Sequence, residues 1–144
     1  MLVGEHKHSL DPKKRLSIPA KFRKEIGERV VLTRGLDNCL FLFPIEEWER
    51  LADKLSKLPI GQQDTRAFVR LILAGAAEVE IDQLGRILVP DFLRNYAGLN
   101  KTVIIAGLFN RLEIWDEEKW NVYKANLEKN GDKIAEKLGE LGMI

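Results

Sequence analysis

Short runs of this chain alternate apolar and polar residues with the period of a β-strand. The segment "RLSI" (15–18) places Leu16 and Ile18 on one side of an extended backbone and its polar residues on the other, which predicts a half-buried strand. Four other apolar runs flank glycine-containing turns and predict two hairpins: "RVVLTR" (29–34) with "CLFLF" (39–43), and "TVIIA" (102–106) with "LEIW" (112–115).

Helical periodicity marks the segments between these strands. The segments "AKFRKEIG" (20–27) and "DFLRNYAG" (91–98) each follow a proline and end in glycine, which predicts two-turn helices. Pro19 and Pro90 cannot donate to a strand ladder, so each ends the strand before it. Longer apolar stripes predict four further helices: 45–58 (Trp48, Leu51, Ala52, Leu55, Leu58), a connector at 62–76, a segment with Trp120, Tyr123 and Leu127, and a C-terminal helix at 131–142.

The chain repeats itself. "HSLDPKKRLSIP" (8–19) returns as "VEIDQLGRILVP" (79–90), with Asp four residues before Arg and Pro four residues after it in both copies. The similarity extends over two units, 5–55 and 77–127. Because a few short strands expose unpaired edges, we expect the two units to interleave their strands. The predicted fold is α+β: one domain over 1–144, in which two pseudo-symmetric units form one β-barrel flanked by helices.

Composition describes an ordinary globular protein of 144 residues, with 45% hydrophobic and 31% charged residues. No apolar run approaches the roughly 20 residues that cross a bilayer, so no membrane partner is expected. The first residues lack the apolar core of a signal peptide, so the expected location is the cytoplasm. The single cysteine, Cys39, excludes an internal disulfide and a cysteine-based zinc site.

Charge is distributed unevenly although the net charge is only +1. Between residues 7 and 34 basic residues far outnumber the acids Asp11, Glu25 and Glu28, whereas acids slightly outnumber basic residues between 78 and 106. This asymmetry indicates a nucleic-acid or other acidic partner for the first unit. The basic residues of that stretch are Lys7, Lys13, Lys14, Arg15, Lys21, Arg23, Lys24, Arg29 and Arg34.

The repeated turn carries the candidate chemistry. An Asp at the start of a turn accepts a hydrogen bond from the backbone two residues on and can pair with an Arg that folds back, so we interpret Asp11, Asp82 and Arg86 as structural. In the first turn, Lys13, Lys14 and Arg15 are adjacent cations suited to phosphates and base edges. Three cations of the following helix extend the predicted DNA-binding set: Lys21, Arg23 and Lys24.

Other candidate sites are weaker. His6 and His8 share a strand face but have no evident third metal ligand, so no metal site is predicted. We expect Cys39 to pack as a small hydrophobe, and Trp48 and Trp120 to belong to the core. No catalytic constellation and no glycine-rich phosphate loop occur, which disfavours an enzyme and predicts no cofactor.

"HSLDPKKRLSIPAKFR" together with "VEIDQLGRILVPDFLR" resembles the paired signature of the MraZ family, bacterial transcriptional regulators with an AbrB-like swapped-hairpin fold. The resemblance covers residues 2 to about 127. It implies binding of double-stranded DNA at direct repeats in the promoter of the division and cell-wall gene cluster, usually as a repressor. It also implies a ring-shaped homo-oligomer and association with the nucleoid.

The signature residues match Asp11 and Arg15 in the first copy and Asp82 and Arg86 in the second. Two positions depart from the family pattern. Lys14 stands where the family usually has glycine, which matters if the turn needs a positive φ. Leu84 replaces a residue that is more often polar, which disfavours DNA contact by the second turn.

On this interpretation the first turn alone meets DNA, with Arg15 reading bases and the lysines positioning the protein. Three alternatives remain at this point. The chain could be an antitoxin-type regulator of the same fold, a module that docks an acidic protein through its basic face, or a metal-dependent hydrolase.

Overall fold

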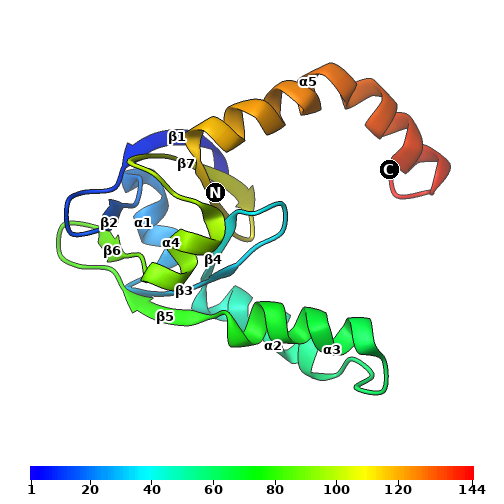
Figure 1. Ribbon diagram of the computed structural model, residues 1–144, viewed down its shortest axis with the longest axis horizontal. Helices are drawn as coiled ribbons and strands as arrows, with labels where there is room; N and C mark the ends of the chain where they lie inside the picture. Colours follow the sequence, from blue (N-terminus) through cyan, green and yellow to red (C-terminus); the bar gives the residue numbers. More distant parts are fainter.

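Six strands form one antiparallel sheet in the computed structural model, which describes residues 1–144. Their order across the sheet is β1-β7-β8-β4-β3-β5, and a separate two-stranded sheet pairs β2 with β6. The larger sheet curves around the smaller one (Figure 1). The strands are β1 (Leu2–Ser9), β2 (Arg15–Ser17), β3 (Arg29–Arg34), β4 (Leu40–Pro44), β5 (Ala77–Glu80), β6 (Arg86–Leu88), β7 (Thr102–Phe109) and β8 (Leu112–Asp116).

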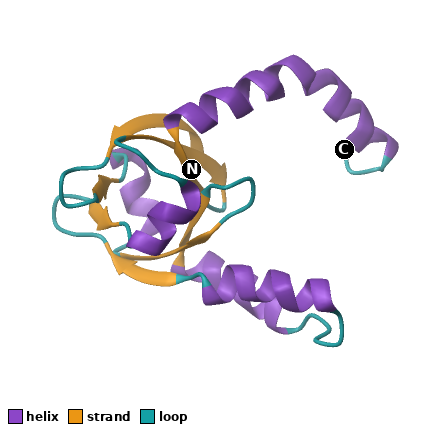
Figure 2. Ribbon diagram, viewed as in Figure 1, coloured by secondary structure: helices purple, strands orange, loops and turns teal.

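Five α-helices complete a mixed α+β fold, as predicted. The short helices α1 and α4 lie within the curve of the sheet, while α2 with α3 and the long α5 project from the opposite side to the β1–β2 and β5–β6 turns (Figure 2). The helices are α1 (Ala20–Ile26), α2 (Ile45–Ser56), α3 (Gln63–Val69), α4 (Asp91–Ala97) and α5 (Glu117–Glu140), and a π-helical turn (Arg70–Ala74) continues α3.

The two halves of the chain exchange strands. β1 of the first half pairs along its whole length with β7 of the second half, and β5 of the second half pairs with β3 of the first. The β4–β8 pair joins the two hairpins in the middle of the sheet. No closed barrel is found, because β1 and β5 remain the two edges of the larger sheet.

The core is built from the repeated apolar positions. Residues at the same place in both units are buried and belong to one cluster, so neither half has a core of its own. These matched pairs are Leu16 with Ile87, Ile18 with Val89, Phe22 with Leu93, and Ile26 with Ala97. Burying such side chains contributes about 1.5–3 kcal/mol each, which stabilises the interleaved arrangement over two separate units.

The C-terminal region differs from the prediction. Instead of a separate helix at 131–142, a single helix α5 runs from Glu117 to Glu140 through Gly131. A glycine inside a helix costs only about 1 kcal/mol relative to alanine, and the surrounding Lys, Glu, Ala and Leu are good helix formers.

The two helix tryptophans also differ from the prediction. Trp48 and Trp120 are half-buried and lie outside the main core. Trp48 packs on Phe43, and Trp120 packs on Trp115 with its indole N–H donated to Glu5. A tryptophan at the base of each projecting helix therefore attaches that helix to the sheet.

Candidate nucleic-acid interface

The first turn, residues 11–15, is held by one carboxylate. Oδ1 of Asp11 accepts the backbone N–H groups of Lys13 and Arg15, both at 2.9 Å. Oδ2 accepts Nε–H of Arg15 at 2.7 Å, and the backbone N–H of Lys14 donates to the Asp11 carbonyl at 2.9 Å. Both carboxylate oxygens thus serve the turn itself, so the loop has one defined shape.

The second turn, residues 82–86, repeats this arrangement. Oδ1 of Asp82 accepts the backbone N–H groups of Leu84 and Arg86 at 2.9 Å, and Oδ2 accepts Nε–H of Arg86 at 2.9 Å. The backbone of Gly85 donates to the Asp82 carbonyl, as Lys14 does in the first turn. The D-x-x-x-R spacing therefore builds the same loop twice.

The backbone of both turns includes one residue with a positive φ. Lys14 has φ 64° and Gly85, at the equivalent place, has φ 78°. This is the left-handed region, in which a residue other than glycine is strained. The turn therefore keeps its backbone shape although Lys14 stands at a position that suits glycine.

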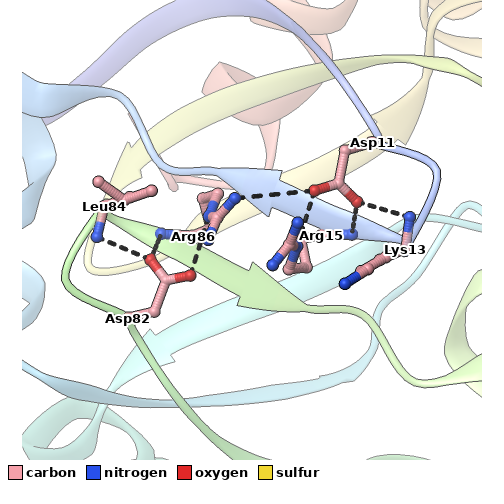
Figure 3. A network of polar contacts seen from close by, with 6 residues as sticks. All are labelled: Asp11, Lys13, Arg15, Asp82, Leu84 and Arg86. Carbon is pink, nitrogen blue, oxygen red and sulfur yellow. Dashed lines mark hydrogen bonds and ion pairs between the residues drawn. The ribbon is translucent and has the colours of Figure 1, made fainter.

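The pairing of β2 with β6 joins the two turns, which lie at opposite ends of this small antiparallel sheet (Figure 3). Leu16 pairs with Ile87 at the centre of this small sheet. Nη1 of Arg86 lies 4.0 Å from Oδ2 of Asp11, so the two ion pairs are neighbours. Both turns therefore lie on one face of the molecule, whereas the sequence predicts a role in binding for the first turn alone.

Hydrogen bonding keeps both aspartates charged. The backbone N–H of Arg15 makes the largest contribution to lowering the pKa of Asp11 below its ordinary value, and its side chain adds to this. Arg86 lowers the pKa of Asp82 in the same way. Because each carboxylate remains ionised at neutral pH, each arginine remains held beside its turn.

The cations at the tip of the first turn are free to meet a partner. The side chains of Lys13 and Lys14 are exposed and make no ion pair. The side chain of Arg15 is 31% exposed, and only its Nε is used by Asp11, so its terminal nitrogens remain available. An arginine held by Asp11 and preceded by two exposed lysines suits a polyanion.

The cations of α1 do not join this tip. Arg23 lies over Gly85 of the second turn and donates to the carbonyl of Ile18 at 2.9 Å. Lys21 lies 5.1 Å from the centre of the Phe22 ring, and Lys24 lines a hollow beside β4. None of these contacts is with the first turn, and DNA binding by Lys21, Arg23 and Lys24 stays a prediction.

Strand pairing explains this exchange. Because β2 and β6 run antiparallel, the end of each strand lies beside the turn of the other unit: Ile18 N–H donates to the Gly85 carbonyl, and Val89 N–H to the Lys14 carbonyl. The cations that do flank the first turn are consequently Arg94 of α4 and Lys101. Sequence analysis missed both, and only the inferred interleaving of the units could have indicated them.

Comparison with known proteins was made on the whole sequence. A family model described as "MraZ protein, putative antitoxin-like" matches residues 1–71 and again 72–139. The chain belongs to the MraZ family. Each of the two stretches that match the MraZ model contains one of the two aspartate-braced turns.

Several curated MraZ relatives are similar over their full length. "Transcriptional regulator MraZ" of Acetivibrio thermocellus is 52% identical over 143 residues, covering 99% of this chain and 100% of the relative. The proteins of the same name from Caldicellulosiruptor saccharolyticus and Clostridium tetani are 51% and 49% identical, again over 99% of this chain and 100% of each relative.

The remaining candidates in this MraZ-family chain lie away from the turns. His6 stacks edge-on against Phe22 at 5.2 Å, and burial together with His6 and Arg23 lowers the pKa of His8. No group of three or more potential metal ligands is present. Cys39 is buried, and burial raises the pKa of its thiol. No helix is both long and apolar enough to cross a membrane.

Proposed function

We propose that this chain regulates transcription by binding double-stranded DNA through the face formed by its two turns. The observation that carries the proposal is the pair of aspartate-braced turns, held at the two ends of the β2–β6 sheet, with exposed lysines at the tip of one. Membership of a family whose relatives are named transcriptional regulators supports it.

The two kinds of cation have different roles in this proposal. Lys13 and Lys14 neutralise phosphates, which fixes the position of the protein on the duplex without reading sequence. Arg15 reaches base edges in the major groove, where a guanidinium binds guanine through two hydrogen bonds. Asp11 holds Arg15 through Nε, which leaves the two terminal nitrogens for the base. We extend this role to Arg86, which Asp82 holds in the same way.

A single turn pair offers few contacts, so we infer that several copies act together. In this proposal the two tandem units form one AbrB-like domain, the domains close into a ring-shaped homo-oligomer, and neighbouring copies bind direct repeats of a promoter. Linked binding events raise the overall affinity without new contacts, which selects several repeats over one. We place this promoter at the division and cell-wall gene cluster and expect repression.

Titration of duplexes carrying one, two or three direct repeats tests the proposal. Wild-type affinity should rise with repeat number, and the Arg15→Ala variant should lose most of it. Loss of the brace alone could unfold the turn, so each variant is first checked by thermal unfolding.

A double variant, Lys13→Gln with Lys14→Gly, keeps the brace and lowers the net charge by two. Its matched control, Lys129→Gln with Lys133→Gln, makes the same charge change on exposed positions of α5. The proposal requires a loss of binding in the first variant only. Equal binding by both, or co-purification of a small toxin-like protein in place of DNA binding, would contradict it.

A further inference from the structure

Two equivalent hollows flank the pair of turns. One, of about 460 Å³, lies between the first turn and the start of the loop after α4; the other, of about 500 Å³, lies between the second turn and the loop after α1. The interleaved fold generates both, because each turn is packed beside the helix of the other unit. We refer to them as the first-turn hollow and the second-turn hollow.

One backbone contact defines matching positions in the two hollows. The residue before each turn aspartate donates its N–H to a loop carbonyl at 2.8 Å: Leu10 to Lys101, and Ile81 to Glu28. Lys101 and Glu28 thus occupy equivalent positions in the two units, and each lines the hollow of its side. The first-turn hollow therefore has the cation Lys101 at the position where the second-turn hollow has the carboxylate Glu28.

The other charged residues of the first-turn hollow are also mostly cations. The first-turn hollow has three cations, Lys14, Arg94 and Lys101, and one carboxylate, Asp11. That carboxylate already accepts three N–H groups of its own turn, so it repels an incoming anion less than a free one would. Asp91 pairs with Arg94 at 2.7 Å from outside the lining, and with Asp91 counted the hollow still has three cations against two carboxylates.

The second-turn hollow has the opposite balance. It is lined by two arginines, Arg23 and Arg29, and by three carboxylates, Glu28, Glu80 and Asp82. Arg29 is further neutralised by Glu78, whose carboxylate lies 2.6 Å away. An anion is therefore attracted to the first-turn hollow and not to its equivalent.

We propose that the first-turn hollow binds a phosphate group of the DNA backbone, with Arg94 and Lys101 as its ligands beside Lys14. The inference rests on the proposed DNA binding and adds residues of the second unit to it. Arg94 is the better-fixed ligand, because its side chain is only 16% exposed and Asp91 orients its guanidinium. Lys101 supplies a mobile charge whose backbone is held beside the turn by Leu10.

The test measures affinity for a promoter duplex and for an unrelated duplex at several salt concentrations. Loss of one phosphate contact lowers the slope of log K against log salt by about 0.9, which is roughly a fivefold to tenfold loss near 0.1 M salt. We expect this for Lys101→Gln on both duplexes, because a phosphate contact carries no sequence information. Glu28→Gln, at the matched position, should leave the slope unchanged.

A charge exchange separates local from overall electrostatics. Lys101→Glu with Glu128→Lys, at an exposed position of α5, keeps the net charge, so binding that depends only on overall charge would return to the wild-type value. We expect the loss to persist, and recovery would overturn the inference. Thermal unfolding of each variant checks that these exposed substitutions leave the fold intact.

The two proposals fail in different ways. If wild type binds neither duplex, the proposed function is wrong. If wild type binds and the Lys13→Gln, Lys14→Gly variant does not, while Lys101→Gln and Arg94→Gln bind like wild type with an unchanged slope, only the phosphate hollow is wrong.

Discussion

At the residue scale, Lys14 combines a strained backbone with an exposed charge. Its φ of 64° matches the 78° of Gly85 at the equivalent place, although only glycine adopts this region at no cost. A left-handed conformation costs a non-glycine residue about 1–2 kcal/mol. The position therefore trades some stability for a cation at the tip of the proposed DNA-binding turn.

The substitution Lys14→Gly should separate these two properties. Relief of strain, offset by the greater entropy of glycine in the unfolded chain, should raise the free energy of unfolding by no more than about 1 kcal/mol. DNA affinity should fall at the same time. Urea unfolding and a binding titration measure the two effects. As a control, Gly85→Ala should destabilise the fold, since alanine is strained at a φ of 78° and its Cβ would displace the Arg23 side chain.

Acid should loosen both turns. Because hydrogen bonds from Arg15 and Arg86 lower the pKa values of Asp11 and Asp82 in the folded state, their stabilisation is complete above the ordinary aspartate pKa of about 3.9. It is lost as the pH falls through the lowered folded-state values. Asp11→Asn should therefore lower stability at pH 7 and flatten the decline of stability below about pH 4. The free energy of unfolding of wild type and of Asp11→Asn is measured as a function of pH. Parallel curves for the two proteins would contradict this prediction.

At the element scale, the small β2–β6 sheet is the joint between the two units. It has only three residue pairs, yet Leu16 and Ile87 at its centre are fully buried. The turns that β2 and β6 follow keep their relative position only while this joint is packed. Its side chains therefore form part of the core and also support the proposed binding face.

Truncation of that central pair should be costly. Leu16→Ala and Ile87→Ala each remove a fully buried side chain, so each should lower the free energy of unfolding by about 2–5 kcal/mol. The neighbouring Leu88 is 58% exposed, and Leu88→Ala should change the free energy of unfolding by less than about 0.5 kcal/mol. Denaturant titrations that show equal effects for Leu16 and Leu88 would refute this view of the joint.

Local patterns predict most elements well, since apolar spacing and the punctuating prolines and glycines act within each segment. The two short helices end at Gly27 and Gly98 as predicted. Local patterns do not show which residues of one unit lie beside the turn of the other unit. Arg23 follows the first turn in sequence but lies beside the second, and Arg94 occupies the corresponding place at the first. That assignment depends on strand register, which local periodicity does not encode.

At the scale of the whole molecule, the two turns and the projecting helices lie at opposite ends (Figure 1). No residue of α5 is buried, and its C-terminal half extends away from the sheet. Few contacts tie that half to the core, so it forms a region of low local stability. The proposed binding face is thereby separated from the most exposed part of the chain.

Removal of residues 131–144 should leave the fold nearly as stable as before. These side chains are exposed apart from the half-buried Leu138, so we expect the free energy of unfolding to change by less than about 1 kcal/mol. Thermal unfolding at one fixed protein concentration measures this. A much larger loss would mean that the segment is buried against another copy in solution.

The contrast between Lys101 and Glu28 has a consequence for direction. If the two loops were identical and related by a two-fold axis, the molecule would bind a duplex in two opposite orientations with equal affinity. If this face binds DNA as proposed, opposite charges at matching places make the two orientations on the duplex inequivalent, and one orientation is preferred. Neighbouring molecules bound in the same orientation would recognise sequence repeats that run in the same direction. Inverted repeats would be bound less tightly.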